Sequence, residues 1–134
     1  MKLRLRGDSL RFRLTATEVT TLRDQGWWQD AATLGPEAGP RFVYRVETAA
    51  VDKSAVRFAS GTDTTITVVL PAAEVAHWAG DGSQVGLYFE ESWGLKVAVE
   101  KDFRCLDPRR DEDESDNFDN PNAGTNQHGE CHAE

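Results

Sequence analysis

The sequence has no hydrophobic run long enough for a membrane helix, few cysteines and a shortage of basic residues. None of its apolar stretches approaches the roughly 20 residues that a transmembrane helix needs. The first residues, which alternate basic and apolar side chains, do not resemble a secretory signal. Two cysteines in 134 residues are too few for a disulfide scaffold. These absences predict a cytoplasmic protein that does not have a membrane as its partner.

The charge is unevenly distributed along the chain. Fifteen basic against 23 acidic residues give a formal charge of −8, which disfavours non-specific nucleic-acid binding. The net charge is +3 over residues 1–57, −4 over 58–104 and −7 over 105–134, so the argument against nucleic acid is weaker for the first two segments. The last segment contains few aliphatic side chains, and it buries too little apolar area to fold alone. We therefore expect one domain at 1–104 and an acidic tail at 105–134.

Two stretches that lie 56 residues apart resemble each other. Leu14–Gly26 and Leu70–Gly82 share a leucine, an alanine, a glutamate, a valine and the closing glycine. Both are predicted to be short helices. In the first, Thr15 and Glu18 have the spacing of a capping box. In the second, Pro71 suits the first turn, where no backbone N–H is needed.

Runs of alternating apolar and polar residues flank both helices. A period of two predicts half-buried antiparallel strands. The runs cover residues 3–6, 10–14, 28–34, 41–48, 56–58, 66–70, 85–90 and 95–101. The order is ββαββ, written twice. We predict an α+β domain, mainly antiparallel, in which the two repeats form a pseudo-twofold, eight-stranded barrel or sandwich with two short helices.

Basic residues alternate with apolar residues along the first two predicted strands. If these strands pair, one sheet face carries Lys2, Arg4, Arg6, Arg11 and Arg13, with Arg45 and Arg57 as neighbours. Such a face is either an ordinary solvated surface or an anion-binding surface for phosphate, nucleotide or an acidic peptide. The tail itself contains an acidic run, residues 111–116, that would fold back over this face.

The tetrapeptide Gly7-Asp8-Ser9-Leu10 matches the signature of a group of serine hydrolases. A nucleophilic serine needs a histidine base and an acid, and the Asp-x-x-His motif of that group is absent from this sequence. Gly, Asp and Ser are also ordinary turn residues. We therefore expect a hairpin turn at this position.

Residues 1–104 also contain four tryptophans and one histidine. Apolar periodicity predicts that Trp28 and Trp78 pack in the core, whereas Trp27 and Trp93 lie near turns and are expected to be exposed. His77 is expected on the surface of the second helix.

Both cysteines and two of the three histidines lie in the tail. Thiolate and imidazole are ligands that suit zinc and copper, and the predicted ligand set is Cys105, His128, Cys131 and His132. A metal bound there would tie down a segment that cannot fold alone. Because no Cys-x-x-Cys is present, a disulfide between the two cysteines and two free thiols are the alternatives.

Two stretches resemble the opening and the ending of a family of small bacterial proteins of unknown function. The opening is Lys2–Thr15 with the Glu-Val pair that follows it, and the ending is Gly94–Leu106 with Asn117-Phe118 and Asn120-Pro121. The resemblance therefore spans nearly the whole chain. The family's late Phe-Pro-Asn-Pro pattern has Asp119 in place of its first proline here.

The resemblance implies a late cysteine, which Cys131 would match. It therefore favours Cys105 and Cys131 as a functional pair. It implies no activity, and it does not extend to His128 or His132.

We interpret the chain as a non-catalytic cytoplasmic domain that binds one zinc or copper ion through its tail and needs no organic cofactor. The second hypothesis is a protein- or anion-interaction module that uses the basic N-terminal sheet face, with the acidic tail as an internal mask. Its partner would be another protein rather than nucleic acid or a membrane. An enzyme would require a deep pocket lined by His77 or by a cluster of carboxylates.

Overall fold

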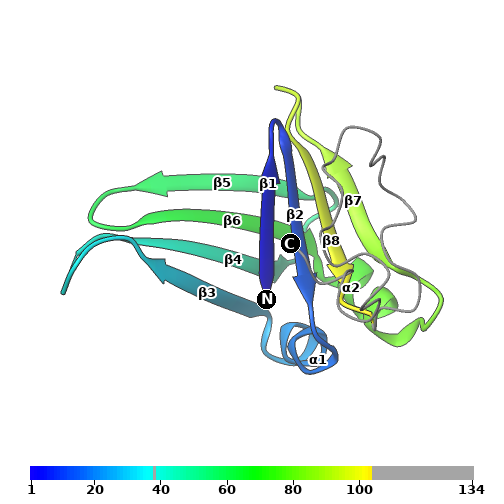
Figure 1. Ribbon diagram of the computed structural model, residues 1–134. Coiled ribbons are helices and arrows are strands. Elements are labelled where there is room, and N and C mark those ends of the chain that lie inside the picture. The colour runs from blue at the N-terminus through cyan, green and yellow to red at the C-terminus, as the bar shows by residue number, and fades with distance from the viewer. Residues whose placement is uncertain (38, 104–134) are drawn as a thin grey trace, which may run out of the picture. The chain divides into compact units, whose positions relative to one another are not determined.

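The computed structural model describes residues 1–37 and 39–103, which form eight strands and two helices (Figure 1). In chain order the elements are β1 (Lys2–Arg6), β2 (Ser9–Leu14), α1 (Ala16–Gln25), β3 (Trp27–Thr33), β4 (Arg41–Ala49), β5 (Ala55–Ser60), β6 (Thr64–Pro71), α2 (Ala72–Gly80), β7 (Gly86–Glu90) and β8 (Lys96–Lys101). This order confirms the predicted α+β class. Neither of these helices is long and apolar enough to cross a membrane.

The strands form two four-stranded sheets. Sheet A has the order β1-β2-β8-β7 and sheet B the order β3-β4-β6-β5. In Figure 1 the strands of sheet A run crosswise to those of sheet B, and both helices lie near one end. No pairing between described strands joins the two sheets, so the barrel alternative is wrong. The described part of the chain folds as two separate sheets that share a core.

Each sheet contains one hairpin from each half of the chain. The hairpins are antiparallel, as predicted, and the sheets are mainly antiparallel. The central pairings, β2 with β8 and β4 with β6, are parallel, so the expectation of antiparallel strands is wrong for these two pairs. A parallel pair requires a long connection. Here the connection from β2 to β8 contains both helices and the strands β3 to β7, and the connection from β4 to β6, residues 50–63, contains β5.

The helix ends follow local chemistry. Thr15 is the N-cap of α1, and the predicted capping box with Glu18 is present. The helix ends at Gly26, whose φ of 93° is readily available only to glycine. Pro71 does not occupy the first turn of α2 but is its N-cap, because it still pairs as the last residue of β6.

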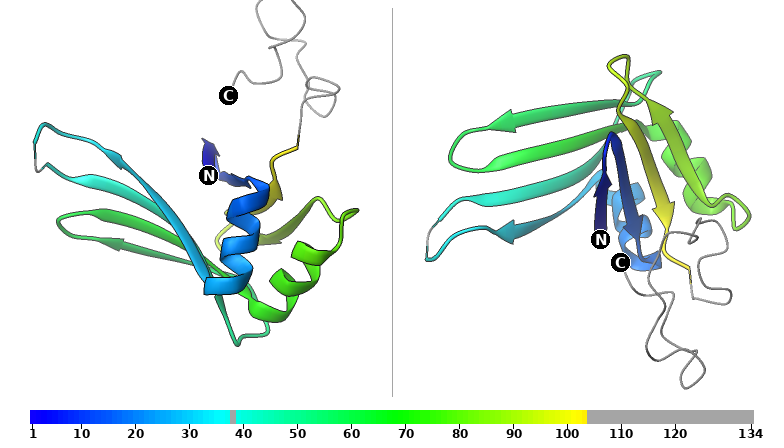
Figure 2. Two further views of the ribbon diagram at one scale, coloured as in Figure 1. Left: turned by 90° about the horizontal axis from the view of Figure 1, so that it is seen from below. Right: turned by 45° about the horizontal axis from the view of Figure 1, so that its top comes forward.

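The core lies between the two sheets and the two helices. Leu10, Phe12 and Leu14 on β2 are buried, and so are Val97 and Val99 on β8. The helices add Val19, Leu22, Val75 and Trp78, and sheet B adds Val46, Val68 and Leu70. The rings of Phe12 and Tyr44 stack with centroids 6.4 Å apart, which joins sheet A directly to sheet B. Figure 2 shows both helices packed beside the two sheets.

The aromatic predictions are largely confirmed. Trp78 is fully buried, and its indole Nε1 donates to the Val85 carbonyl at 3.3 Å. Trp28 is half-buried, whereas Trp27 and Trp93 are exposed. His77 lies on α2 with an exposed side chain, as expected.

Phe12 and Leu5 give a matched pair of stability variants, because both lie on the inner face of sheet A. We predict that Phe12→Ala lowers the free energy of unfolding by about 3–5 kcal/mol, since it leaves a cavity under Tyr44. Leu5→Ala should cost less than about 0.5 kcal/mol, because that side chain is 67% exposed. Urea unfolding measures both values. Equal losses would contradict the placement of the core.

Candidate functional site

The outer face of sheet A carries the basic residues that the sequence singled out. The strand register arranges these residues in three cross-strand rows. From β1 to β7 the rows are Lys2-Arg13-Glu100-Gly86, Arg4-Arg11-Ala98-Tyr88 and Arg6-Ser9-Lys96-Glu90. Residues in the same row of a sheet lie on the same face. The five predicted basic residues therefore share one face, and Lys96 joins them.

Three carboxylates partly neutralise this face, and two of them form ion pairs with its basic residues. Glu100 is the acceptor for Arg11 at 3.2 Å and lies 3.8 Å from the Arg13 guanidinium. Lys2 pairs with Asp102 at 3.3 Å. Six basic side chains thus share the face with Glu90, Glu100 and Asp102, which leaves a net charge of +3.

Arg6 and Lys96 are the basic residues of this face whose charge is least compensated. Both are exposed, and neither has an ion-pair partner within residues 1–37 and 39–103. Arg6 pairs with Ser9, and Ser9 pairs with Lys96, so the two cations flank a small hydroxyl side chain in one row. An anion that lies over Ser9 would contact both.

A shallow depression of about 400 Å³ lies at this end of the face. Its lining includes Ser9, Tyr88, Glu90, Lys96 and Ala98. The small Ser9 and Ala98 side chains occupy the two central strands of the sheet, and longer side chains surround them. The depression therefore offers a polar hydroxyl and an ammonium group beside an aromatic ring.

The position of Tyr88 depends on a glycine. Its hydroxyl donates to Glu100 Oε2 at 2.8 Å. A Cβ at Gly86 would lie 2.9 Å from that hydroxyl oxygen and 2.8 Å from Glu100 Cγ, which is too close for either contact. Gly86 thus permits the hydrogen bond that holds the Tyr88 ring near Glu100.

Arg45 and Arg57 do not belong to this face, and the expectation that they neighbour it is wrong. They lie on β4 and β5, in sheet B. Both pair with Glu47, at 2.7 and 2.6 Å, and Arg45 also lies 4.7 Å from the Trp27 ring centroid. The hydrogen bond from Arg45 lowers the pKa of Glu47 against the opposing effect of burial. These residues form a compensated cluster rather than a basic surface.

The hairpin turn expected at Gly7-Asp8-Ser9-Leu10 is formed by its first two residues. Gly7 and Asp8 form a two-residue turn between β1 and β2, and Gly7 has a φ of 56°. Ser9 is the first residue of β2. His77 does not line the depression next to Ser9. A hairpin turn is therefore present at this position, as predicted, and Ser9 and Leu10 follow it as the start of β2.

The predicted metal ligands Cys105, His128, Cys131 and His132 lie outside the described residues. Within residues 1–37 and 39–103, no group of three or more His, Cys, Asp or Glu side chains is arranged to hold a metal ion. The metal hypothesis therefore stays a prediction.

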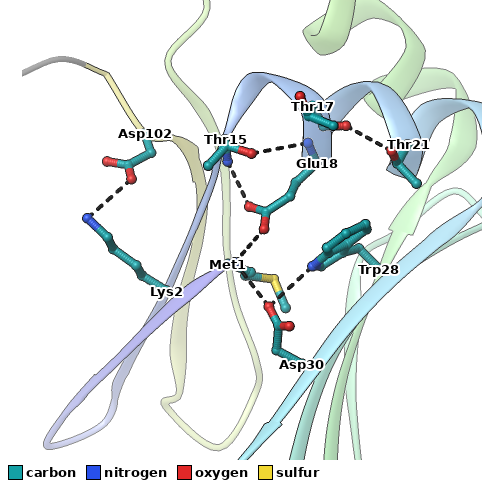
Figure 3. Close-up of polar contacts among 9 residues, drawn as sticks. All are labelled: Met1, Lys2, Thr15, Thr17, Glu18, Thr21, Trp28, Asp30 and Asp102. Atoms are coloured by element: carbon teal, nitrogen blue, oxygen red, sulfur yellow. Dashed lines mark hydrogen bonds and ion pairs between the residues drawn. The ribbon is translucent and has the colours of Figure 1, made fainter.

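The amino group of Met1 forms a second cluster of charge, between α1 and β3 (Figure 3). The ammonium is partly buried and donates to Glu18 Oε2 at 2.6 Å and to Asp30 Oδ2 at 3.0 Å. Trp28 Nε1 also donates to Asp30 Oδ2, at 3.2 Å, and Glu18 Oε1 accepts from the Thr15 backbone N–H. Both carboxylates are thus engaged by the protein itself, so we regard this cluster as structural.

Comparison with known proteins identifies a family for this fold. A family model described as a family of unknown function (DUF7009) matches residues 1–122. The chain belongs to this family. The resemblance inferred from the opening and ending of the sequence is thereby confirmed as a family of unknown function. No curated protein and no solved structure matches the chain significantly.

The family match divides the predicted sites. It includes the whole basic face and Cys105, and it ends before His128, Cys131 and His132. The basic face therefore lies within the matched residues, whereas three of the four predicted metal ligands lie beyond the match.

Sequence reasoning missed Lys96, Tyr88 and Glu100 as members of the basic face. Their strands show the alternation of a sheet with one polar face, which was recognised. Alternation does not identify a strand's neighbours, and the parallel pairing of β2 with β8 was not predicted. The Met1 cluster was missed as well, because it depends on packing between α1 and β3.

The Met1 cluster predicts a pH dependence of stability. Burial lowers the pKa of the ammonium, but the hydrogen bonds and charges of Glu18 and Asp30 outweigh burial and raise it above its ordinary value of 8.0. A raised pKa contributes stability that is fully present below pH 8.0 and is lost as the pH rises through the folded value. We predict a decline above that pH of at most about 1.4 kcal/mol per pH unit in urea unfolding.

Asp30→Asn should flatten this decline, because it removes one of the two charges that raise the pKa. Glu74→Gln is the control, since Glu74 is the exposed counterpart of Glu18 on α2. An unchanged decline in Asp30→Asn would show that the ammonium does not titrate as described.

Proposed function

We propose that the domain is a non-catalytic interaction module that binds an acidic protein partner on the outer face of sheet A. The observation that carries this proposal is the strand register, which gathers six basic side chains on one face against three carboxylates. Complementary charge steers association and excludes partners of like charge. The face has a net charge of +3, although residues 1–104 as a whole carry −1.

The form of the face favours a protein ligand over a small ion. The basic residues are spread over three rows and three strands, so they do not converge on one point. Lys2, Arg11 and Arg13 already have carboxylate partners, which weakens their attraction for a single phosphate. A partner with several carboxylates would contact Arg6 and Lys96 together with the paired residues, and it would form several charge-assisted hydrogen bonds.

We propose that the acidic tail regulates this face as an internal mask. Residues 105–134 carry a net charge of −7, and the run Asp111–Asp116 contains five carboxylates. A tethered acidic segment competes at a high effective concentration with an external ligand. The tail would thus weaken the binding of a partner, and only a partner with higher affinity for the face would displace it.

Metal binding by the tail is a separate proposal. It is supported by the residue types alone, because Cys105, His128, Cys131 and His132 are ligands that suit zinc and copper(I).

We propose that the protein acts in the cytoplasm, where thiols stay reduced and available as ligands.

We also propose that the two halves of the domain are duplicated ββαββ units. Exchanging the equivalent elements of the two halves converts the order of sheet A into that of sheet B. Residues 56 positions apart are buried in both halves, namely Leu14 and Leu70, Val19 and Val75, and Leu22 and Trp78. These correspondences support a pseudo-twofold relation between the halves.

Charge reversal tests the interaction face. We predict that Arg6→Glu and Lys96→Glu each weaken binding of a peptide of about eight glutamates roughly fivefold, because an exposed pair contributes up to about 1 kcal/mol. Fluorescence anisotropy with a labelled peptide measures the affinity, which should also fall as salt rises. The matched control is Lys53→Glu, which changes the charge equally at an exposed position outside the sheets.

An equal loss of affinity in the control would mean that only net charge matters, and it would contradict a dedicated face.

The masking role has its own variant within this test, in which the five carboxylates of Asp111–Asp116 are replaced by Asn and Gln. This full-length variant should bind the glutamate peptide more tightly at low salt and equally at high salt. Unchanged affinity at low salt would remove the masking role and leave the face itself in place.

The metal proposal is tested by elemental analysis of protein purified without a histidine tag. We predict about one zinc or copper ion per chain, and its loss in the Cys105→Ser/Cys131→Ser variant, because thiolates are the strongest ligands of the set. Absence of metal from the wild-type protein, or its retention in the double variant, would reject the proposal.

A further inference from the structure

The first strand of sheet A has an open edge. Among the described strands β1 pairs only with β2, so its other side presents unpaired backbone groups. The side chains along β1 alternate strictly, with Lys2, Arg4 and Arg6 on the outer face and Leu3 and Leu5 on the inner face. An exposed edge of this kind is a template for pairing with another strand.

The hairpin geometry identifies the free hydrogen-bonding groups. The two-residue turn at Gly7 and Asp8 makes Arg6 and Ser9 the pair that closes the ladder. Hydrogen-bonded and non-hydrogen-bonded pairs alternate along an antiparallel ladder. Leu3 and Leu5 therefore direct their N–H and C=O groups away from β2, toward the open edge. These two residues offer the docking points for an added strand.

Apolar side chains on the inner face continue beyond this edge without cover. Leu5 and Phe58 are each 67% exposed, although Leu10, which pairs with Leu5, is only 2% exposed. In sheet B, Phe58 on β5 lies opposite Ile66, whose side chain packs against the core. The ring of Phe42, also in sheet B, stacks on Tyr44 with ring centroids 6.1 Å apart. In Figure 1, sheet B extends past β1 on the side opposite β2. An added strand at β1 would lie over this part of sheet B.

We propose that the open edge of β1 binds an extended segment of a partner protein in which acidic and large apolar residues alternate. The segment would become the fifth strand of sheet A. Its acidic side chains would lie beside Lys2, Arg4 and Arg6 at cross-strand distance, and its apolar side chains would cover Leu5 and Phe58. This inference rests on the proposed function, since it names the form in which an acidic partner engages the β1 side of that face; Lys96, on β8, would lie beyond the cross-strand contacts of the added strand.

Charge disfavours a second copy of this chain as the added strand. Antiparallel pairing of β1 with β1 of another molecule would place Arg4 opposite Arg4 and Lys2 opposite Arg6. Like charges directly opposite each other are destabilising. The cations along β1 therefore protect the edge from self-association, and they attract an acidic strand.

The opposite edge of sheet A is less suitable. There β7 carries Tyr88 and Glu90 on the outer face, and its inner Leu87 is already buried. An acidic strand would meet a carboxylate and would find little apolar surface to cover. The observations therefore select β1 within sheet A.

The test uses the full chain and a capped synthetic peptide of about eight residues in which Glu and Val alternate. The comparison peptide has the same composition with all glutamates followed by all valines. We expect the alternating peptide to bind at least about tenfold more tightly by isothermal titration calorimetry, since only it presents both faces at once. Equal affinity of the two peptides would overturn strand addition.

Backbone methylation of the peptide tests edge pairing without changing the protein. N-methylation of one alternate set of amides, either the Glu set or the Val set, should abolish binding, whereas methylation of the other set should preserve it. Which set matters reports whether the added strand is antiparallel or parallel. Equal effects of the two methylations would overturn the proposal.

Protein variants connect the peptide to β1. Leu5→Ala and Phe58→Ala should each weaken the alternating peptide about threefold or more without changing the affinity of the glutamate peptide. Arg6→Glu should weaken both peptides, and Lys53→Glu neither. If Arg6→Glu weakens both while the apolar variants have no effect, the basic face stands and strand addition falls. If neither peptide binds, the proposed function falls as well.

Discussion

The domain depends on two parallel strand pairings, each of which joins a hairpin of the first half of the chain to a hairpin of the second. Without the pairing of β2 with β8, sheet A would be two separate hairpins, and the same holds for β4 and β6 in sheet B. Isolated hairpins are marginally stable in water. The buried residues lie mainly on these four central strands and on the two helices, so the pairings and the core form together.

The alternation along β1 and β2 then determines which face is apolar and which is charged. With a period of two, the leucines and Phe12 face the core while the basic residues face outward. A slip of one residue would bring arginine into the core, so burial fixes the register strongly. The basic face is therefore inseparable from the core: the same ladder that buries Phe12 places Arg11 and Arg13 beside Glu100.

Local signals in the sequence were sufficient to predict the eight strands, the two helices and the capping box at Thr15. Each depends on residues within a few positions of one another. The sheet order was beyond such reasoning, because alternation shows that a strand has two faces but not which strand lies beside it. Arg45 and Arg57 were misplaced for this reason, and Lys96 was missed. The five basic residues of β1 and β2 were grouped correctly because a tight turn joins their strands.

The five-residue link between β4 and β5, residues 50–54, has a consequence for how the chain can assemble. Each sheet takes one hairpin from each side of this link, so neither half contains a complete sheet. Two molecules that opened there would each supply the hairpins that the other lacks, and they would regain every strand pairing. The interlocked order that stabilises one molecule is therefore also compatible with an exchanged dimer. The length and stiffness of this short link decide between the two forms.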